Sequence, residues 1–592
     1  MKNVLRDYIY YVKKSRQLDK WYFVLFFCDV IFQIVSPFVL VVFPKYILNE
    51  IVTTRRIDQI IILLILMVVV DVIVNSLVQI FSPLLNSRIH YLRNQMSIEF
   101  SKKVLDLDYD KIEDPKIMDM KQKAIEFIYG GEGIENVTFS AEKILVSIGQ
   151  MIGYAYILFF CNPAIIVLIV ICAFITARWH GKAEKYSYDA NNEVIRENRQ
   201  GSYLDFVCSD YEHYKDIRFF ELKNWILDKK NYYNDIKLKV FKRSSKKFLK
   251  LGLTTTLMNN FLSLIYYSYL IYLLFINKIF IGDFTMYLSS ITNFATTANT
   301  ISISMAKMIQ ADLRLRNYIE FMNIKNDMTE DKDVLKVNFQ KEKFKIVFED
   351  VSFKYPYANE WTLEKINVEI NSGEKISIVG ENGAGKTTFI KLLMRLYDPT
   401  SGRITINGID IRNVDYIEYM RLFSAVFQDY HLFPFSIKEN ITFEKSNKIN
   451  DEEIIKILEE VGLKSKVENC KNGIHTGLSK QFDDEGTDLS GGESQKIAIG
   501  RAIYRNSPII VLDEPTAALD PMAEYDIYKK YDLMVKEKTS IFISHRMAST
   551  KLSDKILVFQ QGKLVEVGTH MELMKNKGLY CNMYEIQKEY YI

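Results

Sequence analysis

The sequence predicts a multidomain chain in which an all-α, six-helix transmembrane domain is followed by an α/β P-loop domain. Three observations predict this fold class. The 592 residues are too many for one domain. Long apolar runs are confined to residues 1–310, and the mean hydropathy near zero averages two unlike halves. Residues 380–388, GENGAGKTT, match the phosphate-loop pattern G-x-x-x-x-G-K-[ST].

Composition excludes several classes of protein. The net charge of +3 gives no reason to expect a nucleic-acid partner. Six cysteines are scattered without a C-x-x-C pair, so we expect neither a cysteine metal site nor a disulfide framework. Residues 1–20 are polar, aromatic and basic and lack the apolar core of a signal peptide, so they predict an amphipathic helix on the cytosolic membrane face.

Six runs within residues 21–310 approach the ~20 residues that a helix needs to cross a bilayer. They lie at about 21–43, 59–82, 138–160, 163–179, 252–276 and 284–308. The intervening loops 86–137 and 180–250 are long and rich in Lys and Arg, which places them in the cytoplasm. The sequence therefore predicts a multi-pass protein of the cell membrane, with the lipid bilayer as partner and both termini in the cytoplasm.

The two long loops should continue the membrane helices, because structureless loops of that length are uncommon. Local breaks occur at residues 113–116 and 215–220. Each break predicts a short helix that docks on the P-loop domain, and the alternative is a pair of solvated loop features.

Polar residues inside the spans need partners or water. The last span is rich in Ser, Thr and Asn, so it lines a hydrated cavity or packs closely through small residues. Asp71 lies in the middle of the second run with Asn75 one turn later, and Asp29 of the first run is a possible partner. The cost of placing a carboxylate at mid-membrane makes Asp71 a candidate for contact with cargo or a proton, the alternative being a packing role.

The phosphate loop stands between an apolar strand, 375–379, and an apolar helix, 389–396, as the motif requires. Its glycines let backbone N–H groups point inward at phosphates, together with the helix N-terminus. Lys386 adds a positive charge and Thr387 offers a hydroxyl to Mg²⁺. The predicted ATP-binding residues here are Gly380, Glu381, Asn382, Gly383, Ala384, Gly385, Lys386, Thr387 and Thr388.

Further motifs follow in a fixed order. LSGGESQ at residues 489–495 resembles the signature motif of ATP-binding cassette (ABC) proteins, and the apolar strand 509–512 followed by Asp513 and Glu514 resembles their Walker B motif. The resemblance also assigns a Q-loop glutamine, a D-loop, a switch histidine and an adenine-stacking aromatic. These are Gln428, residues 517–520 with Asp520, His545 and Tyr355.

A six-span domain followed by one cassette is similar to the layout of an ABC exporter half-transporter. The predicted parts are an amphipathic helix at 1–20, a transmembrane domain at 21–310, a linker at 311–343 and a cytoplasmic ABC ATPase domain at 344–592.

Each residue type fits the role that the resemblance implies. Thr387, Gln428 and Asp513 offer the oxygen ligands that Mg²⁺ prefers. Glu514 is placed to polarise the attacking water, and His545 to contact the γ-phosphate. Together with Lys386 and Gln428 these two residues form the predicted catalytic set.

The signature residues Ser490, Gly491 and Gly492 open a helix whose N-terminus suits an anion. The resemblance implies that they serve ATP held by the opposite cassette, so a second half-transporter is required. A homodimer is favoured, while the departures Glu493 and Ala517 from common family residues leave a heterodimer open.

The expected function is ATP-driven export of a peptide or an amphipathic small molecule, because the elements at 113–115 and 216–220 resemble those of exporters of modified peptides such as lantibiotics. The alternatives are a multidrug or lipid exporter or flippase and a metal-chelate importer with an exporter-like fold. A soluble cassette ATPase would lack the spans, and an ATP-gated channel would tolerate loss of Glu514, which is present.

Overall fold

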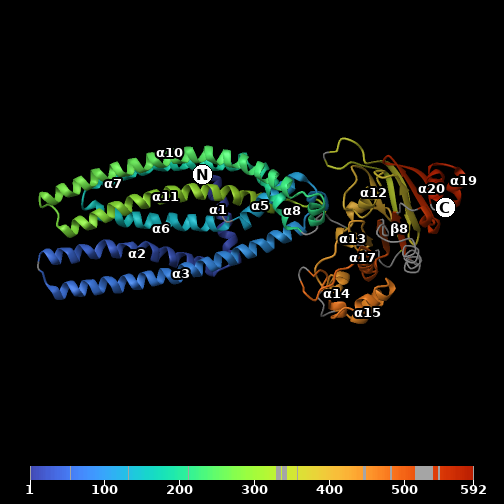
Figure 1. The fold of residues 1–592 in the computed structure, drawn as a ribbon, viewed down its shortest axis with the longest axis horizontal. Coiled ribbons are helices and arrows are strands. Elements are labelled where there is room, and N and C mark those ends of the chain that lie inside the picture. Colours follow the sequence, from blue (N-terminus) through green and yellow to red (C-terminus); the bar gives the residue numbers. More distant parts are fainter. Residues whose placement is uncertain are drawn as a thin grey trace. The chain divides into compact units, whose positions relative to one another are not determined.

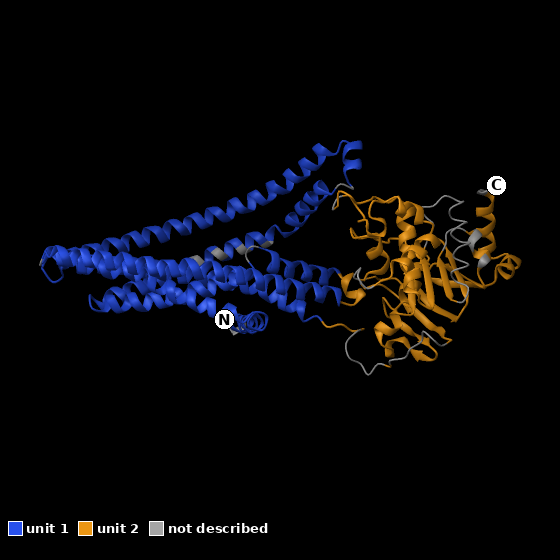
Figure 2. Cartoon of the chain, turned by 90° about the horizontal axis from the view of Figure 1, so that it is seen from below, with its two compact units in different colours: residues 1–106, 115–324 blue, residues 107–114, 325–592 orange. Residues whose placement is uncertain are grey.

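The computed structural model describes two compact units. It describes residues 2–53, 55–130, 133–210, 213–328, 335, 343–356, 358–444, 449–480, 483–513, 538–543 and 547–590. Unit 1 comprises residues 1–106 and 115–324, and unit 2 comprises residues 107–114 and 325–592 (Figure 2). Most of the predicted linker at 311–343 beyond residue 328 lies outside the described residues.

Unit 1 is helical throughout its described residues (Figure 1). Its helices are α1 (Lys2–Leu18), α2 (Trp21–Val52), α3 (Ile57–Leu105), α5 (Pro115–Tyr129), α6 (Ile134–Phe159), α7 (Pro163–Glu193), α8 (Ile195–Ser209), α9 (Tyr214–Phe219), α10 (Lys223–Phe275) and α11 (Ile281–Met322). The prediction that the long loops continue the membrane helices is confirmed, because α3 and α10 extend far beyond the apolar runs that they contain. A short helix, α9, lies at the predicted break in the second loop.

Among the described residues, the helices α2, α3, α7 and α10 are long and apolar enough to cross a membrane. The other two predicted spans lie in α6 and α11, which are long but more polar. These two helices pack against each other, and α11 also packs against α2, α5 and α7. A helix enclosed by its neighbours needs no broad lipid-facing apolar stripe, which explains why its sequence is less hydrophobic.

Several hydroxyl groups of α11 donate hydrogen bonds to carbonyl oxygens of their own helix. Thr292 donates to the Leu288 carbonyl over 2.9 Å, and Thr297 donates to the Asn293 carbonyl over 2.6 Å. Thr296, Thr300 and Ser302 make the same kind of bond. These bonds satisfy five hydroxyl groups without water, whereas the buried Ser290 hydroxyl of the same helix has no hydrogen-bond partner among the described residues.

Asp29 of α2 is 1% exposed and has one hydrogen-bond partner on α3 and another one turn later on α2 itself. Ser82 of α3 donates to Asp29 over 2.5 Å, and the Gln33 amide donates both to Asp29 and to Glu142 of α6, each over 2.7 Å. Asp29 therefore forms hydrogen bonds with Ser82 and Gln33. The sequence suggested Asp71 as its partner. On α3, Asn75 accepts a hydrogen bond from Ser36 of α2 over 2.7 Å.

Unit 2 contains two sheets. The first has the order β2 (Leu363–Asn371), β1 (Lys345–Phe353), β4 (Ser401–Ile406), β5 (Ile409–Asp410) and is antiparallel. The second has the order β10 (Lys563–Gly568), β9 (Lys555–Gln560), β3 (Lys375–Gly380), β8 (Thr539–Ile543), β7 (Ile509–Asp513), β6 (Phe423–Val426). Only the β10–β9 pair in it is antiparallel.

The described α-helices of unit 2 connect and cover these strands. They are α4 (Tyr109–Ile112), α12 (Lys386–Leu393), α13 (Tyr416–Met420), α14 (Ile437–Thr442), α15 (Asp451–Glu460), α16 (Lys464–Glu468), α17 (Gly491–Arg505), α19 (His570–Asn576) and α20 (Leu579–Tyr590). The neighbouring strands β3, β8, β7 and β6 run parallel, so their carboxyl ends share one edge of the sheet, which is where ligands bind in open α/β sheets.

Candidate ATP-binding site

The phosphate loop joins the end of β3 to the start of α12 and depends on glycine at two places. Gly380 has φ +152°, and a Cβ atom there would lie 2.3 Å from the Phe559 carbonyl oxygen. Gly385 has φ +99°, and its Cβ would lie 2.6 Å from a methyl group of Leu363. Any side chain would strain the backbone and displace β9 or β2, so this loop shape requires glycine.

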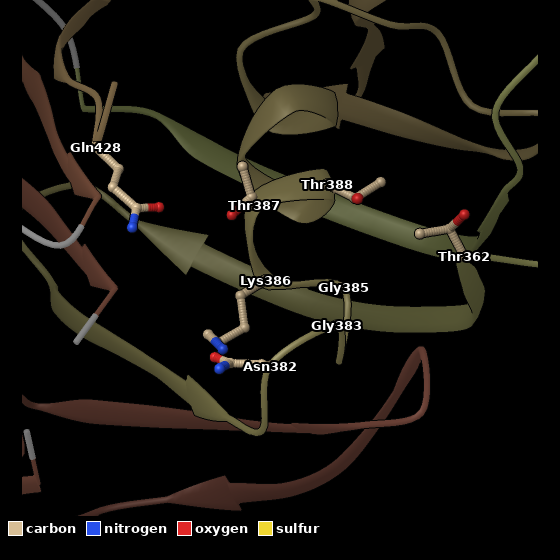
Figure 3. Close-up of a pocket in the computed structure, with 8 residues that line it drawn as sticks. All are labelled: Thr362, Asn382, Gly383, Gly385, Lys386, Thr387, Thr388 and Gln428. Carbon is tan, nitrogen blue, oxygen red and sulfur yellow. The ribbon is translucent and has the colours of Figure 1, made fainter. Parts of the chain in front are cut away.

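The loop encloses a cavity of about 530 Å³. Its lining residues are Thr362, Asn382, Gly383, Gly385, Lys386, Thr387, Thr388 and Gln428 (Figure 3). The Lys386 ammonium donates to the carbonyl oxygens of Gly380 and Glu381, each over 2.9 Å, and the lysine is 6% exposed. These bonds hold its charge at the base of the loop, where phosphate oxygens would meet it.

Three oxygen-bearing residues lie at this edge of the sheet on different elements. Thr387 is the second residue of α12, Gln428 follows β6, and Asp513 ends β7 with 3% exposure. Of these, Thr387 and Gln428 line the cavity. Figure 3 shows the Thr387 side chain on the side of the loop where Gln428 lies, whereas Thr388 points the other way. A hydroxyl, an amide and a carboxylate oxygen are the donors that a hard divalent cation prefers, so the set fits Mg²⁺.

Tyr355 does not line this cavity but is tied to it. Its hydroxyl shares a hydrogen bond of 3.0 Å with the Thr388 hydroxyl, and its ring packs edge-on against Tyr397, with centroids 5.4 Å apart. Tyr355 and Tyr397 line a second cavity of about 490 Å³, together with Asp110 of α4. The predicted adenine-stacking residue thus connects the phosphate loop with residues 107–114.

Residues 107–114 belong to unit 2, which confirms that the break at residue 113 docks on the P-loop domain. Glu113 accepts a hydrogen bond from the Tyr397 hydroxyl and another from Lys391 of α12 over 3.4 Å. Burial alone would raise the pKa of Glu113, but the hydroxyls of Tyr397 and Tyr109 and the charge of Lys391 together hold that pKa below its ordinary value.

The predicted signature residues open α17. Ser490 is its N-cap: the Glu493 N–H donates to the Ser490 hydroxyl over 3.3 Å, and the Ser490 N–H donates to the Glu493 carboxylate over 2.9 Å. The departure Glu493 therefore completes a capping box, a role that glutamine also performs. This backbone hydrogen bond is the main reason that the pKa of Glu493 is lowered.

Four residues that the sequence analysis singled out lie outside the described residues, and one residue that lines the cavity was not among the predicted ones. Glu514, Asp520 and His545 lie outside the described residues, as does Ala517. Thr362, just before β2, lines the cavity and was not predicted. Its neighbour Leu363 packs against the loop at Gly385. No sequence motif predicts this contact, because the two segments are distant in the chain.

Comparisons with known proteins agree with this arrangement. The family model described as "ABC transporter" matches residues 363–517. The chain is 29% identical over 601 residues to the subtilin transport ATP-binding protein SpaT of Bacillus subtilis, covering 98% of this chain and 95% of that protein. It is 37% identical over 242 residues to the ATP-dependent lipid A-core flippase of Methylobacillus flagellatus, covering 41% of each.

A solved structure supports the fold of the whole chain. The structure of a bacterial Atm1-family ABC exporter with ATP bound has a TM-score of 0.79 and 20% sequence identity, covering 97% of this chain and 99% of that one. The chain therefore carries an ABC transporter ATP-binding domain joined to a helical domain with candidate membrane spans, and it is similar over nearly its whole length to a bacterial ABC exporter.

Proposed function

We propose that this chain uses ATP hydrolysis to export a modified peptide across the cell membrane. The observation that carries this proposal is the extent of the similarity to the subtilin transport protein, which includes the helices of unit 1 as well as the ATP-binding domain. Transmembrane helices supply the path of the cargo, whereas the ATP-binding domain is shared by exporters of many cargoes. A match that covers the helices as well as the ATP-binding domain is therefore more informative about the cargo than a match that covers the ATP-binding domain alone.

In the proposed reaction, backbone N–H groups of residues 380–388 and the Lys386 ammonium bind the phosphates of ATP. Thr387, Gln428 and Asp513 would hold Mg²⁺, which would supply neutralisation of phosphate charge. Glu514 orients and polarises the attacking water, and His545 contacts the γ-phosphate. Tyr355 stacks on the adenine, and Asp520 contributes to the interface between the two ATP-binding domains.

Two variants separate binding from hydrolysis. Lys386→Ala should abolish ATP binding, because it removes the positive charge from the cavity. Glu514→Gln should bind ATP normally but hydrolyse it slower by orders of magnitude, since the phosphate loop is intact. Binding is measured with a fluorescent ATP analogue and hydrolysis by phosphate release, and near-normal turnover by Glu514→Gln would remove the assignment of Glu514.

We propose that the working form is a homodimer in which Ser490, Gly491 and Gly492 of each subunit complete the ATP site of the other. Support comes from Ser490, which is exposed at the N-terminus of α17, where backbone N–H groups face solvent. Mixing Lys386→Ala chains with Ser490→Ala chains should restore one complete site per mixed dimer. ATP hydrolysis at the full rate by isolated monomers would contradict this arrangement.

Lipid export is the second candidate, because the lipid A-core flippase of Wigglesworthia glossinidia brevipalpis is 27% identical over 76% of this chain. The purified protein in nanodiscs distinguishes the candidates. A subtilin-type precursor peptide should stimulate ATP hydrolysis under the peptide proposal, and lipid A should not. The opposite response would favour the flippase.

A further inference from the structure

The helix α20 packs on the short helix η6 (Met547–Leu552), which begins two residues after the predicted switch residue His545. The contact is within the core: Met547 is 2% exposed, and Thr550 and Tyr580 are fully buried. The backbone of η6 is thus covered by α20, and α19 packs beside α20.

Side chains hold both backbone polar groups of Met547. Its N–H donates to the side-chain amide oxygen of Gln587 over 2.7 Å, and its carbonyl accepts a hydrogen bond from the Thr550 hydroxyl over 2.7 Å. The first N–H groups of a helix have no partner within that helix, so the one at Met547 requires an outside acceptor. Gln587, on α20, provides it.

A directed chain of hydrogen bonds supports Thr550. Because the Thr550 hydroxyl gives its single hydrogen to Met547, its oxygen must accept from the Tyr580 hydroxyl, 2.6 Å away. Tyr580 likewise has one hydrogen, so it must accept from Nδ1 of His570 over 2.8 Å. The chain therefore runs from α19 through α20 to the backbone of Met547, and each donor in it is used once.

The start of α20 is itself fixed to the sheet. The Glu566 carboxylate on β10 accepts the backbone N–H groups of Leu579 over 2.7 Å and Tyr580 over 3.1 Å. A Cβ atom on Gly578 would lie 1.9 Å from that carboxylate, so the close approach depends on glycine. Strand β10 pairs with β9, and β9 pairs with β3, which leads into the phosphate loop.

We propose that Gln587 and Tyr580 are positioning residues for ATP hydrolysis: they fix the backbone that follows His545 relative to the sheet that carries the phosphate loop. This inference rests on the proposed role of His545. Neither residue lines the phosphate cavity, so neither contributes to ATP binding. Their loss should affect the geometry in which the bound nucleotide is hydrolysed.

The test compares full-length variants in nanodiscs by kcat and KM for ATP and by thermal unfolding. Gln587→Leu has a similar shape but no acceptor, so kcat should fall about tenfold while KM is unchanged. Gln587→Glu keeps an acceptor oxygen and should retain most of the wild-type kcat. Tyr580→Phe removes one hydroxyl from the chain and should lower kcat in the same way. Lys588→Ala, an exposed neighbour on α20, is the matched control.

The outcomes distinguish this inference from the proposal on which it rests. An inactive His545→Ala protein together with wild-type kcat in Gln587→Leu and Tyr580→Phe would overturn the positioning role alone. A parallel loss of ATP binding, kcat and thermal stability would also overturn it, because that pattern indicates only a structural helix. A fully active His545→Ala protein would overturn both the role of His545 and the inference.

Discussion

Glu113→Ala should weaken the attachment of residues 107–114 to the ATP-binding domain. These residues are joined along the chain to α3 on one side and α5 on the other, so they connect the membrane helices to unit 2. The variant removes the acceptor of the Tyr397 hydroxyl and the partner of Lys391. It leaves the phosphate cavity unchanged, because Glu113 does not line it.

The expected cost follows from the exposure of the groups involved. Charge-assisted hydrogen bonds contribute about 1.5–3 kcal/mol in buried settings, and exposed ion pairs about 0.2–1 kcal/mol. The Glu113 and Lys391 side chains are 42% and 21% exposed, which favours the lower range, whereas Tyr397 is 3% exposed and would lose a hydroxyl partner. We expect about 1–2 kcal/mol in total, which lowers the equilibrium constant for docking of this segment roughly 5- to 30-fold.

The assay measures ATP hydrolysis in nanodiscs with and without peptide cargo, alongside hydrogen exchange of residues 107–114. Basal hydrolysis should persist, stimulation by cargo should fall, and exchange of the segment should accelerate. Glu460→Ala, an exposed carboxylate on α15, serves as control. Because the pKa of Glu113 is lowered from 4.5, its contribution is present above about pH 4.5 and is lost as the pH falls through the folded pKa. Normal stimulation with accelerated exchange would refute the coupling role.

Three further predictions concern unit 2. Gly385→Ala should abolish binding of a fluorescent ATP analogue, because a Cβ there strains a backbone at φ +99° and meets Leu363 at 2.6 Å; normal binding would show that the loop tolerates this change. Glu493→Ala should lower the free energy of unfolding by about 1 kcal/mol through loss of the capping box, while Glu493→Gln should match the wild type. Burial and the nearby charge of Lys551 lower the pKa of His570 from 6.5, so the neutral form is favoured in the folded protein. Thermal stability should therefore be full above about pH 6.5 and decline as the pH falls toward the folded pKa, and His570→Gln should reduce that dependence.

The parts of the site that are contiguous in sequence could be predicted. The phosphate loop, its strand and its helix are specified by neighbouring residues, and the structure places seven of the predicted side chains or backbones around one cavity. Gln428 and Asp513 were assigned through the resemblance to ABC proteins, and the parallel strands β6 and β7 lead to both residues at one edge of the sheet. The capping partnership of Ser490 with Glu493 is also local, since S-x-x-E is a helix-start pattern.

Contacts between segments that are distant in the chain could not be predicted, because a single sequence contains no pattern that pairs the residues of one segment with those of another. Thr362 reaches the phosphate cavity from the segment before β2, and Gln587 reaches Met547 from α20. Asp29 is joined through Gln33 to Glu142, a residue that no sequence pattern singled out. The lower hydropathy of α6 and α11 likewise reflects enclosure by other helices, which only the packing shows.

The central claim is that ATP hydrolysis at this chain's phosphate loop drives outward movement of a peptide. Inside-out membrane vesicles that contain the protein test it most directly, because outward transport becomes uptake of labelled subtilin-type precursor peptide from the medium. Wild-type vesicles should accumulate peptide only when ATP is supplied, and Lys386→Ala vesicles should accumulate none. Equal uptake by Lys386→Ala vesicles, or vigorous ATP hydrolysis by the wild type with no peptide uptake, would contradict the account.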